Sequence, residues 1–287
     1  MEFFILGGDS RNIELTKLLA KDENIVYTYG LEKAFNEKEE DEIFKNIIFC
    51  EDLKSIQKAK IIVTSLPISK DGINLNMPYS NKNITIKDLL SILKGKIIFT
   101  GNISTEIENI LKKENEIIDI MKKEEFAILN AIPTAEATIS IMIENTKKII
   151  HNSKCLIMGF GRIGKVLANK LKALSVNVTC TTINKEEAAW AETYGYQVIN
   201  FKDIENVLGH YDIIINTIPK LVLNDEVKKI RNEALIIDLA SNPGGINKEI
   251  AKRENKKLIC ALGLPGKVAP ITSAEYIRNV VFNVLNK

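Results

Sequence analysis

A glycine-rich stretch in the middle of the chain, Gly159-Phe-Gly-Arg-Ile-Gly164, has the residue types and spacing that bind a dinucleotide. Apolar residues 156–158 precede it, and an amphipathic segment that carries Leu167 and Leu171 follows it. In such a turn the first glycine allows the tight turn, the second lets the backbone approach a pyrophosphate, and the third lets the helix pack on the strand. Free N–H groups at the start of the helix would stabilise the phosphate charge. The sequence therefore predicts a dinucleotide-binding turn.

The next predicted strand, residues 176–181, ends in Thr181-Thr-Ile-Asn-Lys185. In NAD-binding enzymes this position usually provides a carboxylate for the ribose hydroxyls, about 20 residues beyond the first glycine. Here the first acidic residue after the strand is Glu186. Two threonine hydroxyls, an amide and a lysine could instead bind a 2′-phosphate. We therefore predict NADP(H) as the cofactor and expect NAD(H) to bind less well.

The later strands of this half also end in small or turn-forming residues, which allow close approach of a ribose or a nicotinamide amide. We expect the cofactor to contact residues from all of these turns: Gly159, Phe160, Gly161, Arg162, Ile163, Gly164, Thr181, Thr182, Asn184, Lys185, Thr217, Ile218, Pro219, Ala240, Ser241, Gly263, Leu264 and Pro265.

Few side chains are available for acid–base catalysis. His151 and His210 both precede predicted strands, which places them at the amino ends of a parallel sheet, opposite the ligand side, so a histidine–carboxylate relay is not expected. Asp9, Glu136 and Asp238 are expected on the ligand side, and any of them could act as a general base. Asp238 could equally accept hydrogen bonds from the turn that follows it. The sequence has no His, Cys, Asp and Glu spacing typical of a metal site.

The elements that must position these residues are short apolar strands that alternate with helices. In the first part of the chain the predicted strands are residues 3–6, 25–29, 47–50, 61–64, 97–100 and 117–120. Strict alternation predicts an α/β fold with a parallel, doubly wound sheet, and ligands bind such sheets outside the carboxyl ends of the strands. The same alternation follows the glycine-rich turn. We therefore predict two doubly wound parallel-sheet domains, of which the C-terminal one is a Rossmann dinucleotide-binding domain.

Arg11 lies at the start of a predicted helix, where its charge opposes the helix dipole unless an anion binds there. It could equally be an ordinary surface arginine. The first interpretation predicts an anionic substrate held at the strand ends of the N-terminal domain and at the start of the helix that follows it. The residues assigned to substrate binding are Asp9, Ser10, Arg11, Ser65, Leu66, Pro67, Gly101, Asn102, Pro133, Thr134 and Thr138.

Pro133 pre-sets a helix start and disfavours helix at the residue before it, so we predict a long helix over residues 133–150. This helix would join the domains, with Thr134, Glu136 and Thr138 facing the cleft between them. Alternatively, Thr134 is a helix cap and Glu136 a first-turn acid favoured by the dipole. The predicted organisation is a flavodoxin/Rossmann-like substrate domain (1–130), an interdomain helix (131–151), an NAD(P)-binding Rossmann domain (152–270) and a C-terminal helix that packs back on the N-terminal domain (271–287).

The composition is that of an ordinary globular protein. The 287 residues are 45% hydrophobic and 26% charged, with a formal net charge of +2, so the charge gives no indication of nucleic-acid binding. The four cysteines are widely spaced and are expected to be buried, reduced residues of a cytoplasmic protein. The longest apolar region, residues 126–150, contains Asn130, Pro133, Glu136 and Glu144, which argues against a membrane span.

Several motifs together resemble the A-subunit family of dipicolinate synthase over almost the whole chain. They are Gly7-Gly-Asp-Ser-Arg11, Asn130-Ala-Ile-Pro-Thr-Ala-Glu136, Met158-Gly-Phe-Gly-Arg-Ile-Gly164, Ile215-Asn-Thr-Ile-Pro219, Ile237-Asp-Leu-Ala-Ser-Asn-Pro-Gly-Gly245 and Gly263-Leu-Pro-Gly-Lys-Val-Ala-Pro270. The glycine-rich turn alone is common to many families, whereas the combination is much more specific. One departure is that relatives carry an arginine near the second-strand tip, where this chain has Thr181 and Thr182; it weakens the NADP prediction without reversing it.

The resemblance implies an oxidoreductase that converts dihydrodipicolinate to dipicolinate and reduces NADP. It implies a flavoprotein-like partner, the B subunit of dipicolinate synthase, and the cytoplasm of the mother cell of a sporulating bacterium. It also implies a small cyclic dicarboxylate as substrate, which suits anion binding by Arg11, Ser65 and the hinge threonines. Aromatisation of the ring would drive hydride loss, with Glu136 as the first candidate for the proton acceptor and Asp9 as the second. We also expect an oligomer.

Two other functions stay open at the level of the sequence. The chain could be a general amino- or hydroxy-acid dehydrogenase, although the lack of a ligand-side histidine counts against that. It could also be a nucleotide-binding regulatory or scaffold subunit whose partner carries out the chemistry, because obvious catalytic residues are scarce.

Overall fold

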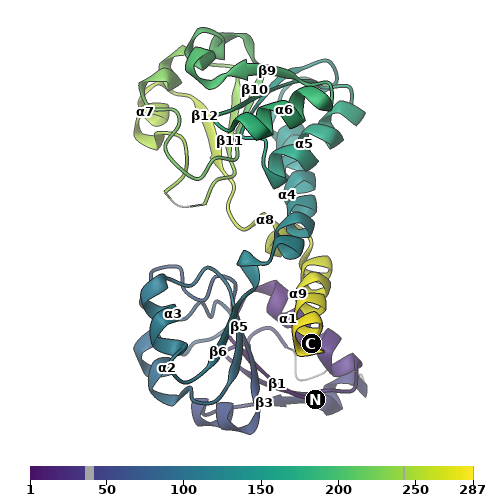
Figure 1. Cartoon of the computed structure of the whole chain (residues 1–287), viewed down its shortest axis with the longest axis vertical. Coiled ribbons are helices and arrows are strands. Elements are labelled where there is room, and N and C mark those ends of the chain that lie inside the picture. Colours follow the sequence, from purple (N-terminus) through teal and green to yellow (C-terminus); the bar gives the residue numbers. More distant parts are fainter. Residues whose placement is uncertain (36–41, 242, 287) are drawn as a thin grey trace. The chain divides into compact units, whose positions relative to one another are not determined.

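The structure is a computed structural model that describes residues 1–35, 42–241 and 243–286. It divides into two compact units (Figure 1), which are Met1–Asn130 together with Gly266–Lys287 (unit 1) and Ala131–Pro265 (unit 2). Each unit contains one six-stranded sheet, and neighbouring strands pair in parallel throughout the described residues. The predicted fold class is therefore confirmed: two doubly wound α/β domains with a long helix between them.

The sheet of unit 1 has the strand order β3-β2-β1-β4-β5-β6. Its strands are β1 (Glu2–Leu6), β2 (Ile25–Tyr29), β3 (Ile47–Phe49), β4 (Ile61–Thr64), β5 (Ile97–Thr100) and β6 (Glu116–Asp119). Its helices are α1 (Ser10–Lys21), α2 (Ile86–Ile92), α3 (Thr105–Leu111) and α9 (Pro270–Leu285), with 3-10 turns η1 (Glu42–Asn46), η2 (Leu53–Lys58) and η3 (Ile120–Lys122). The strand order reverses between β1 and β4, which is where such sheets bind ligands.

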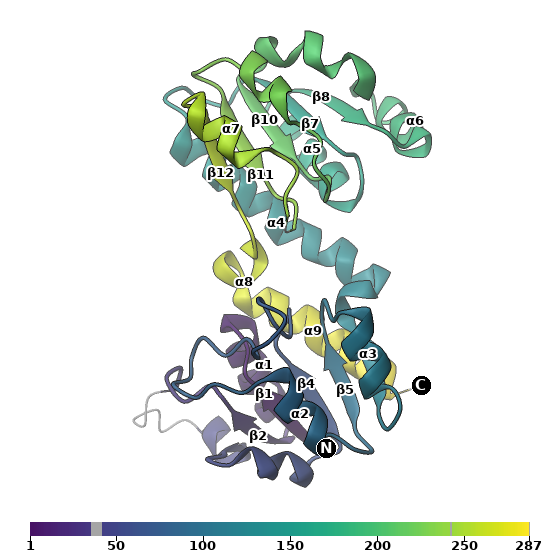
Figure 2. The same cartoon turned by 90° about the vertical axis from the view of Figure 1, so that its left-hand side faces the viewer.

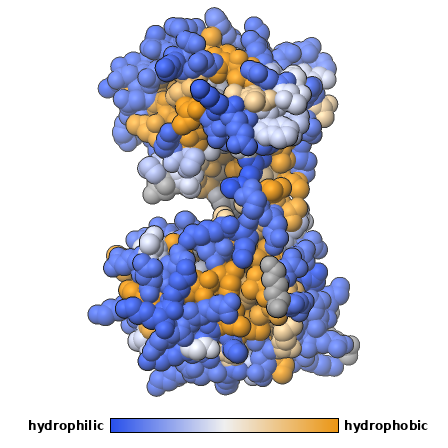
Figure 3. Space-filling model, in the orientation of Figure 1, coloured by the Kyte–Doolittle hydropathy of each residue, from blue (hydrophilic) through white to orange (hydrophobic). Residues whose placement is uncertain are grey.

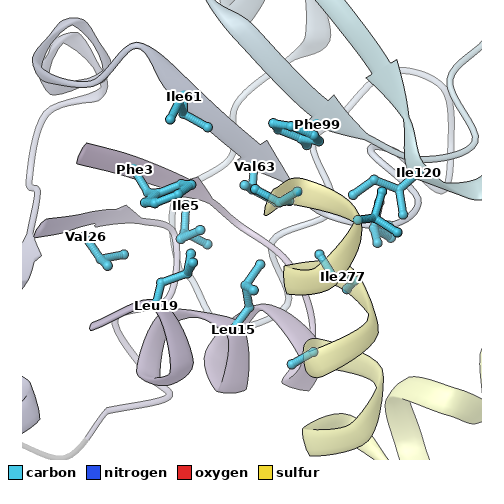
Figure 4. Packing of buried hydrophobic residues seen from close by; sticks show 14 of the residues in the cluster. Phe3, Ile5, Leu15, Leu19, Val26, Ile61, Val63, Phe99, Ile120 and Ile277 are labelled. Atoms are coloured by element: carbon cyan, nitrogen blue, oxygen red, sulfur yellow. The ribbon is translucent and has the colours of Figure 1, made fainter. Parts of the chain in front are cut away.

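Alternate strand residues of unit 1 supply two separate cores. Phe3, Ile5 and Val63 pack with Leu15 of α1 and Ile277 of α9 in one buried cluster (Figure 4). The residues between them on the same strands, such as Phe4 and Ile62, form a second cluster with α2 and α3 on the opposite face. The last helix of the chain, α9, lies beside the first, α1, in both views (Figures 1 and 2). The N-terminal sheet is therefore covered on one face by a helix from the other end of the chain.

The sheet of unit 2 has the order β12-β11-β10-β7-β8-β9, so its strand order reverses between β7 and β10. Its strands are β7 (Lys154–Met158), β8 (Asn177–Thr182), β9 (Gln197–Asn200), β10 (Ile213–Asn216), β11 (Leu235–Asp238) and β12 (Lys257–Cys260). Its helices are α5 (Arg162–Ala173), α6 (Lys185–Thr193) and α7 (Lys248–Arg253), with 3-10 turns η4 (Phe201–Asn206), η5 (Leu208–His210) and η6 (Asp225–Lys229), and α8 (Leu264–Val268) crosses the boundary between the units. The glycine-rich turn joins β7 to α5 beside this reversal.

The helix between the units, α4 (Glu124–Asn145), differs from the prediction. Pro133 was expected to begin the helix, but the structure places it inside a continuous helix that starts nine residues earlier and ends at Asn145. Proline removes only one backbone donor, so the helix loses one hydrogen bond and can continue when its other residues are well packed. Phe126, Ala135 and Met142 are fully buried, which supplies that packing on both sides of the proline.

By length and composition alone, α4 is apolar enough to cross a membrane, although 44% of its apolar window is buried inside the protein. Core helices meet the same criterion, so the property by itself does not identify a membrane protein. The surface of the molecule is mainly hydrophilic, with hydrophobic patches in both units (Figure 3). On α4 the large exposed apolar residues include Ile128 and Ile143.

Helix α9 offers a test of the unit 1 core. Replacing Ile277, which is 1% exposed, with alanine should lower the free energy of unfolding, by about 2–4 kcal/mol, because it leaves a cavity between α9 and the sheet. Ile271→Ala is the matched control, since Ile271 lies on the same helix and is 56% exposed. Chemical denaturation measures both. Equal losses in the two variants would contradict the described packing of α9.

Candidate functional site

The turn after β7 is built from backbone that leaves little room for side chains. Gly159 has φ +93°, and a Cβ there would lie 2.4 Å from Thr217 Oγ1. A Cβ on Gly164 would lie 2.3 Å from the carbonyl oxygen of Gly159, so α5 can pack on the turn only because residue 164 is glycine. On Gly161 the nearest contact would be Glu187 Oε1 at 3.5 Å, which is an ordinary van der Waals distance. The backbone at Gly161 is therefore accessible to a phosphate, as a dinucleotide requires.

Neighbouring strand ends are hydrogen-bonded to this turn. The Gly159 amide donates to Thr181 O (2.7 Å), and both the amide and the hydroxyl of Thr217 donate to Met158 O (2.9 Å each). The ends of β7, β8 and β10 are thus held together at the carboxyl edge of the sheet. The predicted cofactor residues at 159–164, 181–185, 217–219, 240–241 and 263–265 all lie in the loops of this edge.

The predicted residues do not all present side chains. Phe160 is fully buried, with its ring centroid 5.6 Å from that of Tyr196, so it offers its backbone only. Thr181 is buried as well, and its Oγ1 has no hydrogen-bond partner among the described residues. Thr182 donates from Oγ1 to Glu187 Oε2 (2.6 Å). Asn184 caps α6 by accepting from the Glu186 amide (2.9 Å), while Lys185 is exposed.

Glu187 is a residue of this site that could not be identified from the sequence pattern. Its Oε2 also accepts from the backbone amide of Phe160 (3.1 Å), so a carboxylate from α6 lies against the glycine-rich turn. The available signal was the N-cap pattern, because a glutamate three residues after an Asn cap often folds back on its own helix start. Here the side chain reaches the neighbouring turn instead, which sequence spacing does not reveal.

Asp238 holds two loops together. It is 1% exposed, and its carboxylate accepts from Asn216 Nδ2 (2.8 Å) and from the amides of Ala240 (3.1 Å) and Gly245 (2.8 Å). Of the two interpretations open at the level of the sequence, hydrogen bonding to the following turn is the one that the structure confirms. A carboxylate with these three donors fixes the loops after β10 and β11.

In unit 1, Asp9 and Arg11 form a pair at the start of α1. Asp9 Oδ1 accepts from the Arg11 amide (3.1 Å) and Nε (2.9 Å), and Oδ2 accepts from Nη2 (2.8 Å). Arg11 Nη2 also donates to Leu66 O, and the arginine side chain is only 7% exposed. Burial alone would raise the pKa of Asp9, but the hydrogen bonds and the charge of Arg11 outweigh it and lower that pKa. The anion that the position of Arg11 indicated is, in this structure, Asp9 itself.

The other residues assigned to substrate binding lie at the carboxyl ends of β1, β4 and β5. Ser10 Oγ is 3.0 Å from the hydroxyl of Tyr79, and Ser65 Oγ donates to Ile68 O (3.2 Å). Gly101 packs against Leu66, since a Cβ there would lie 2.5 Å from Leu66 Cδ2. The structure therefore brings these residues to one edge of the unit 1 sheet.

Asn102 and Pro67 complete the set in unit 1. Asn102 has φ +53° and is exposed, and it lines a hollow of about 320 Å³ together with Ser69, Lys87 and Ser104. Pro67 follows β4, and the Leu66–Pro67 peptide bond is cis. Asn12 was not identified from the sequence, yet it is 1% exposed and donates to Thr64 O (3.1 Å) at the same edge.

The hinge residues lie on α4 within unit 2. Thr134 and Thr138 are buried, and Thr138 Oγ1 donates to Thr134 O (2.7 Å) as a bond within the helix. Glu136 is exposed over 59% of its side chain and accepts from Lys170 Nζ (2.9 Å). Of the two interpretations of Thr134, a helix cap is wrong, because α4 begins at Glu124. The substrate and catalytic roles of these residues stay predictions.

His151 and His210 precede β7 and β10, so both lie at the amino ends of those strands, as predicted. Among the described residues there is no group of three or more His, Cys, Asp or Glu side chains that could hold a metal ion. Buried Cys155 has a pKa raised far above its usual range by desolvation, which makes its thiol unreactive.

Comparison with known proteins gives matches over both units. Residues 2–121 match the family described as the N-terminal domain of the dipicolinate synthase A subunit, and residues 133–248 match "D-isomer specific 2-hydroxyacid dehydrogenase, NAD binding domain". The dipicolinate synthase A subunit of Bacillus subtilis (strain 168) is 30% identical over 292 residues, covering 99% of this chain and 96% of that protein.

Two solved structures have the same fold along their whole length. The dipicolinate synthase A chain from Bacillus subtilis gives a TM-score of 0.85 at 27% identity, covering 100% of this chain and 96% of that one. The dipicolinate synthase A subunit from Bacillus halodurans gives 0.85 at 24% identity, covering 100% and 98%.

The open backbone at Gly161 generates one prediction. Gly161→Ala should keep the fold, because the nearest contact of the new Cβ is at 3.5 Å, but the methyl group would obstruct a phosphate and weaken dinucleotide binding by about tenfold or more. Thermal unfolding and a dinucleotide titration measure the two effects separately. In Gly164→Ala, by contrast, the Cβ would lie 2.3 Å from a carbonyl oxygen, so that variant should lose stability. Unchanged dinucleotide affinity in Gly161→Ala would contradict the assignment of the turn.

The Asp9–Arg11 pair generates a pH-dependent prediction. The pKa of Asp9 is lowered in the folded protein, so its carboxylate stabilises the fold above the unfolded pKa near 3.8, and this is lost as pH falls through the folded pKa. Asp9→Asn keeps a capping side chain but leaves Arg11 unpaired, and should cost about 2 kcal/mol or more at neutral pH. The difference from wild type should shrink below about pH 4. Asp203→Asn, at an exposed position, is the control; a difference that is constant with pH would contradict the pairing.

Proposed function

This chain belongs to the A-subunit family of dipicolinate synthase, and on that premise we propose that it oxidises dihydrodipicolinate to dipicolinate and transfers the hydride to a nicotinamide dinucleotide. Its dehydrogenase-like character rests on the match of unit 2 to a dehydrogenase NAD-binding domain. The observation that carries the proposal is the glycine-rich turn at the reversal of the unit 2 sheet, where the backbone at Gly161 is accessible.

The residues of unit 2 suit a dinucleotide. The amides at the start of α5 would bind the pyrophosphate, and the loops after β10, β11 and β12 would surround the ribose and the nicotinamide. When bound, a nicotinamide dinucleotide supplies the hydride acceptor. The protein's own part is to bind, orient and keep water away from the reacting groups. The rigid hydrogen bonds of Thr217 and Asp238 would keep those loops in place.

The reaction removes two hydrogens from the dihydropyridine ring, one as hydride and one as a proton, and leaves an aromatic ring. Glu136 is our first candidate for the proton acceptor, since its carboxylate is exposed and its contact with Lys170 is a surface ion pair of low strength. Asp9 is the second candidate, but a lowered pKa makes it a weaker base. A water molecule could take the proton in place of either.

We assign the two substrate carboxylates to the loops at the carboxyl edge of the unit 1 sheet. Those loops carry Ser10, Ser65 and Asn102, with Asp9 and Arg11 paired at the start of α1. Arg11 would act here mainly by fixing the Leu66 loop, because its guanidinium is bonded to Asp9 and to Leu66 O. Pro67 and Gly101 shape the same loops, and Pro133, Thr134 and Thr138 belong to the assignment through the helix of unit 2.

We further propose that the chain works with the B subunit of dipicolinate synthase, in an oligomer, in the cytoplasm of the mother cell of a sporulating bacterium. Its Bacillus subtilis relative is named as one of the synthase's lettered subunits, which supports a second subunit as partner. The cofactor is a nicotinamide dinucleotide, and the choice between NADP and NAD depends on the contacts at the tip of β8.

A second function, a regulatory or scaffold subunit whose partner carries out the chemistry, is favoured by one observation. Two of the carboxylates considered as bases, Asp9 and Asp238, are engaged in hydrogen bonds that hold loops and helix starts. That leaves Glu136 as the first candidate among the three.

The two functions predict different results in one assay. Purified chain is mixed with dihydrodipicolinate and either dinucleotide, with and without the B subunit, and formation of the reduced dinucleotide is followed. We expect production that depends on this chain and is abolished by disabling its glycine-rich turn. Absence of turnover by the chain alone, together with full turnover of the complex after the turn is disabled, would favour the scaffold function instead.

Replacement of the proposed base gives a sharper test. Glu136→Gln should lower turnover by the complex of the A and B subunits, by about 100-fold, which is a typical contribution of general base catalysis. The fold should be unaffected because the residue is exposed. Glu144→Gln, at an exposed position on the same helix, is the matched control. Near-normal turnover in Glu136→Gln would exclude this residue as the base.

A further inference from the structure

Glu187 connects the second helix of unit 2 to the glycine-rich turn. Its Oε2 accepts from the backbone amide of Phe160 (3.1 Å) and from the hydroxyl of Thr182 (2.6 Å). Its Oε1 is the atom closest to the position that a Cβ on Gly161 would occupy, at 3.5 Å. The carboxylate therefore lies between the tip of β8 and the first two glycines of the turn.

This is the region where a dinucleotide-binding fold places the adenine ribose. The residue that binds the ribose 2′-hydroxyl is usually an acid at the end of the second strand. In this chain that strand, β8, ends in Thr182, and the acid comes from the first turn of α6. Thr182 donates to the carboxylate, so the two residues together supply at the strand tip what one aspartate or glutamate supplies elsewhere.

The residues expected to bind a 2′-phosphate are mostly engaged in other contacts. Thr181 is fully buried, the Thr182 hydroxyl donates to Glu187, and the Asn184 side chain caps α6. Of the four, Lys185 is the cation, and it is exposed at the start of the same helix. A phosphate at this tip would therefore approach a fixed carboxylate, with a single flexible lysine to offset the repulsion.

From these contacts we infer that Glu187 is the specificity-determining residue of the dinucleotide site, and that it makes the chain select NAD(H) over NADP(H). A ribose 2′-hydroxyl can donate a hydrogen bond to the carboxylate, whereas a 2′-phosphate adds negative charge beside it. The inference rests on the proposed binding of a nicotinamide dinucleotide. It reverses the cofactor preference that the tip sequence alone predicted.

Glu187 is also held well enough to discriminate. It lies in the first turn of α6, where the helix dipole favours a negative charge, and two donors bind a single carboxylate oxygen. For a 2′-phosphate to bind in its place, the side chain would have to leave both donors, one of which is a backbone amide of the turn itself. Hydrogen bonds to a charged acceptor are the stronger class, so this rearrangement is unfavourable.

The experiment is a titration of the purified chain with NADH and NADPH, followed by nucleotide fluorescence or calorimetry, with no substrate present. Wild type should bind NADH about tenfold more tightly than NADPH, or better, as expected for two like charges a few ångströms apart at a partly buried site. In Glu187→Gln, the preference should fall by about tenfold, through weaker NADH and tighter NADPH binding. Glu186→Gln has the same change in net charge one residue away, and should alter the preference less than about twofold.

Each outcome bears on the inference. Tighter binding of NADPH by wild type would overturn it and leave the proposed oxidoreductase function standing. Equal effects of Glu187→Gln and Glu186→Gln would also overturn it, because the charge would then act at a distance rather than at the ribose. Failure of wild type to bind either nucleotide would overturn both the inference and the proposed function. The wild-type preference needs no variant, so a poorly folded Glu187→Gln does not prevent the test.

Discussion

The close approach of helix α5 to the turn after β7 is the contact on which the rest of unit 2 depends. A Cβ at position 164 would lie 2.3 Å from the carbonyl oxygen of Gly159, so the helix can take this position only with glycine. The same turn donates from Gly159 to the end of β8 and accepts, at Met158, from Thr217 after β10. Three strand ends are thereby fixed around a backbone surface that a dinucleotide can approach.

Much of the polar chemistry at both sheet edges is used to hold loops rather than to react. Asp238 binds three donors after β10 and β11, and Asp9 binds Arg11 at the start of α1. A protein built in this way contributes positioning, and a bound nicotinamide supplies the hydride acceptor. Loss of hydride from a dihydropyridine is favoured by the aromatic product, so few catalytic side chains are needed. The scarcity of reactive groups is therefore compatible with an oxidoreductase.

The fold could be predicted because its signals are local: apolar strands, each followed by turn residues and a helix, identify a doubly wound sheet. Pro133 was misread because its local preference for a helix start is weaker than the burial of Phe126 and Ala135 around it. The role of Arg11 could not be settled from the sequence, since its partner, Asp9, is a neighbour whose alternative role as a helix cap has the same pattern. Glu187 was missed because its contact with Phe160 is tertiary and depends on the direction of one side chain.

The central claim is that this chain holds the nucleotide that accepts the hydride. The most direct measurement uses dihydrodipicolinate carrying deuterium at its saturated ring carbons, in a single turnover by the complex of the A and B subunits, with mass spectrometry of the recovered dinucleotide. We predict one deuterium in the reduced dinucleotide for each dipicolinate formed, and none when the glycine-rich turn of this chain is disabled. Dipicolinate formed at the normal rate without deuterium in the dinucleotide would contradict the claim.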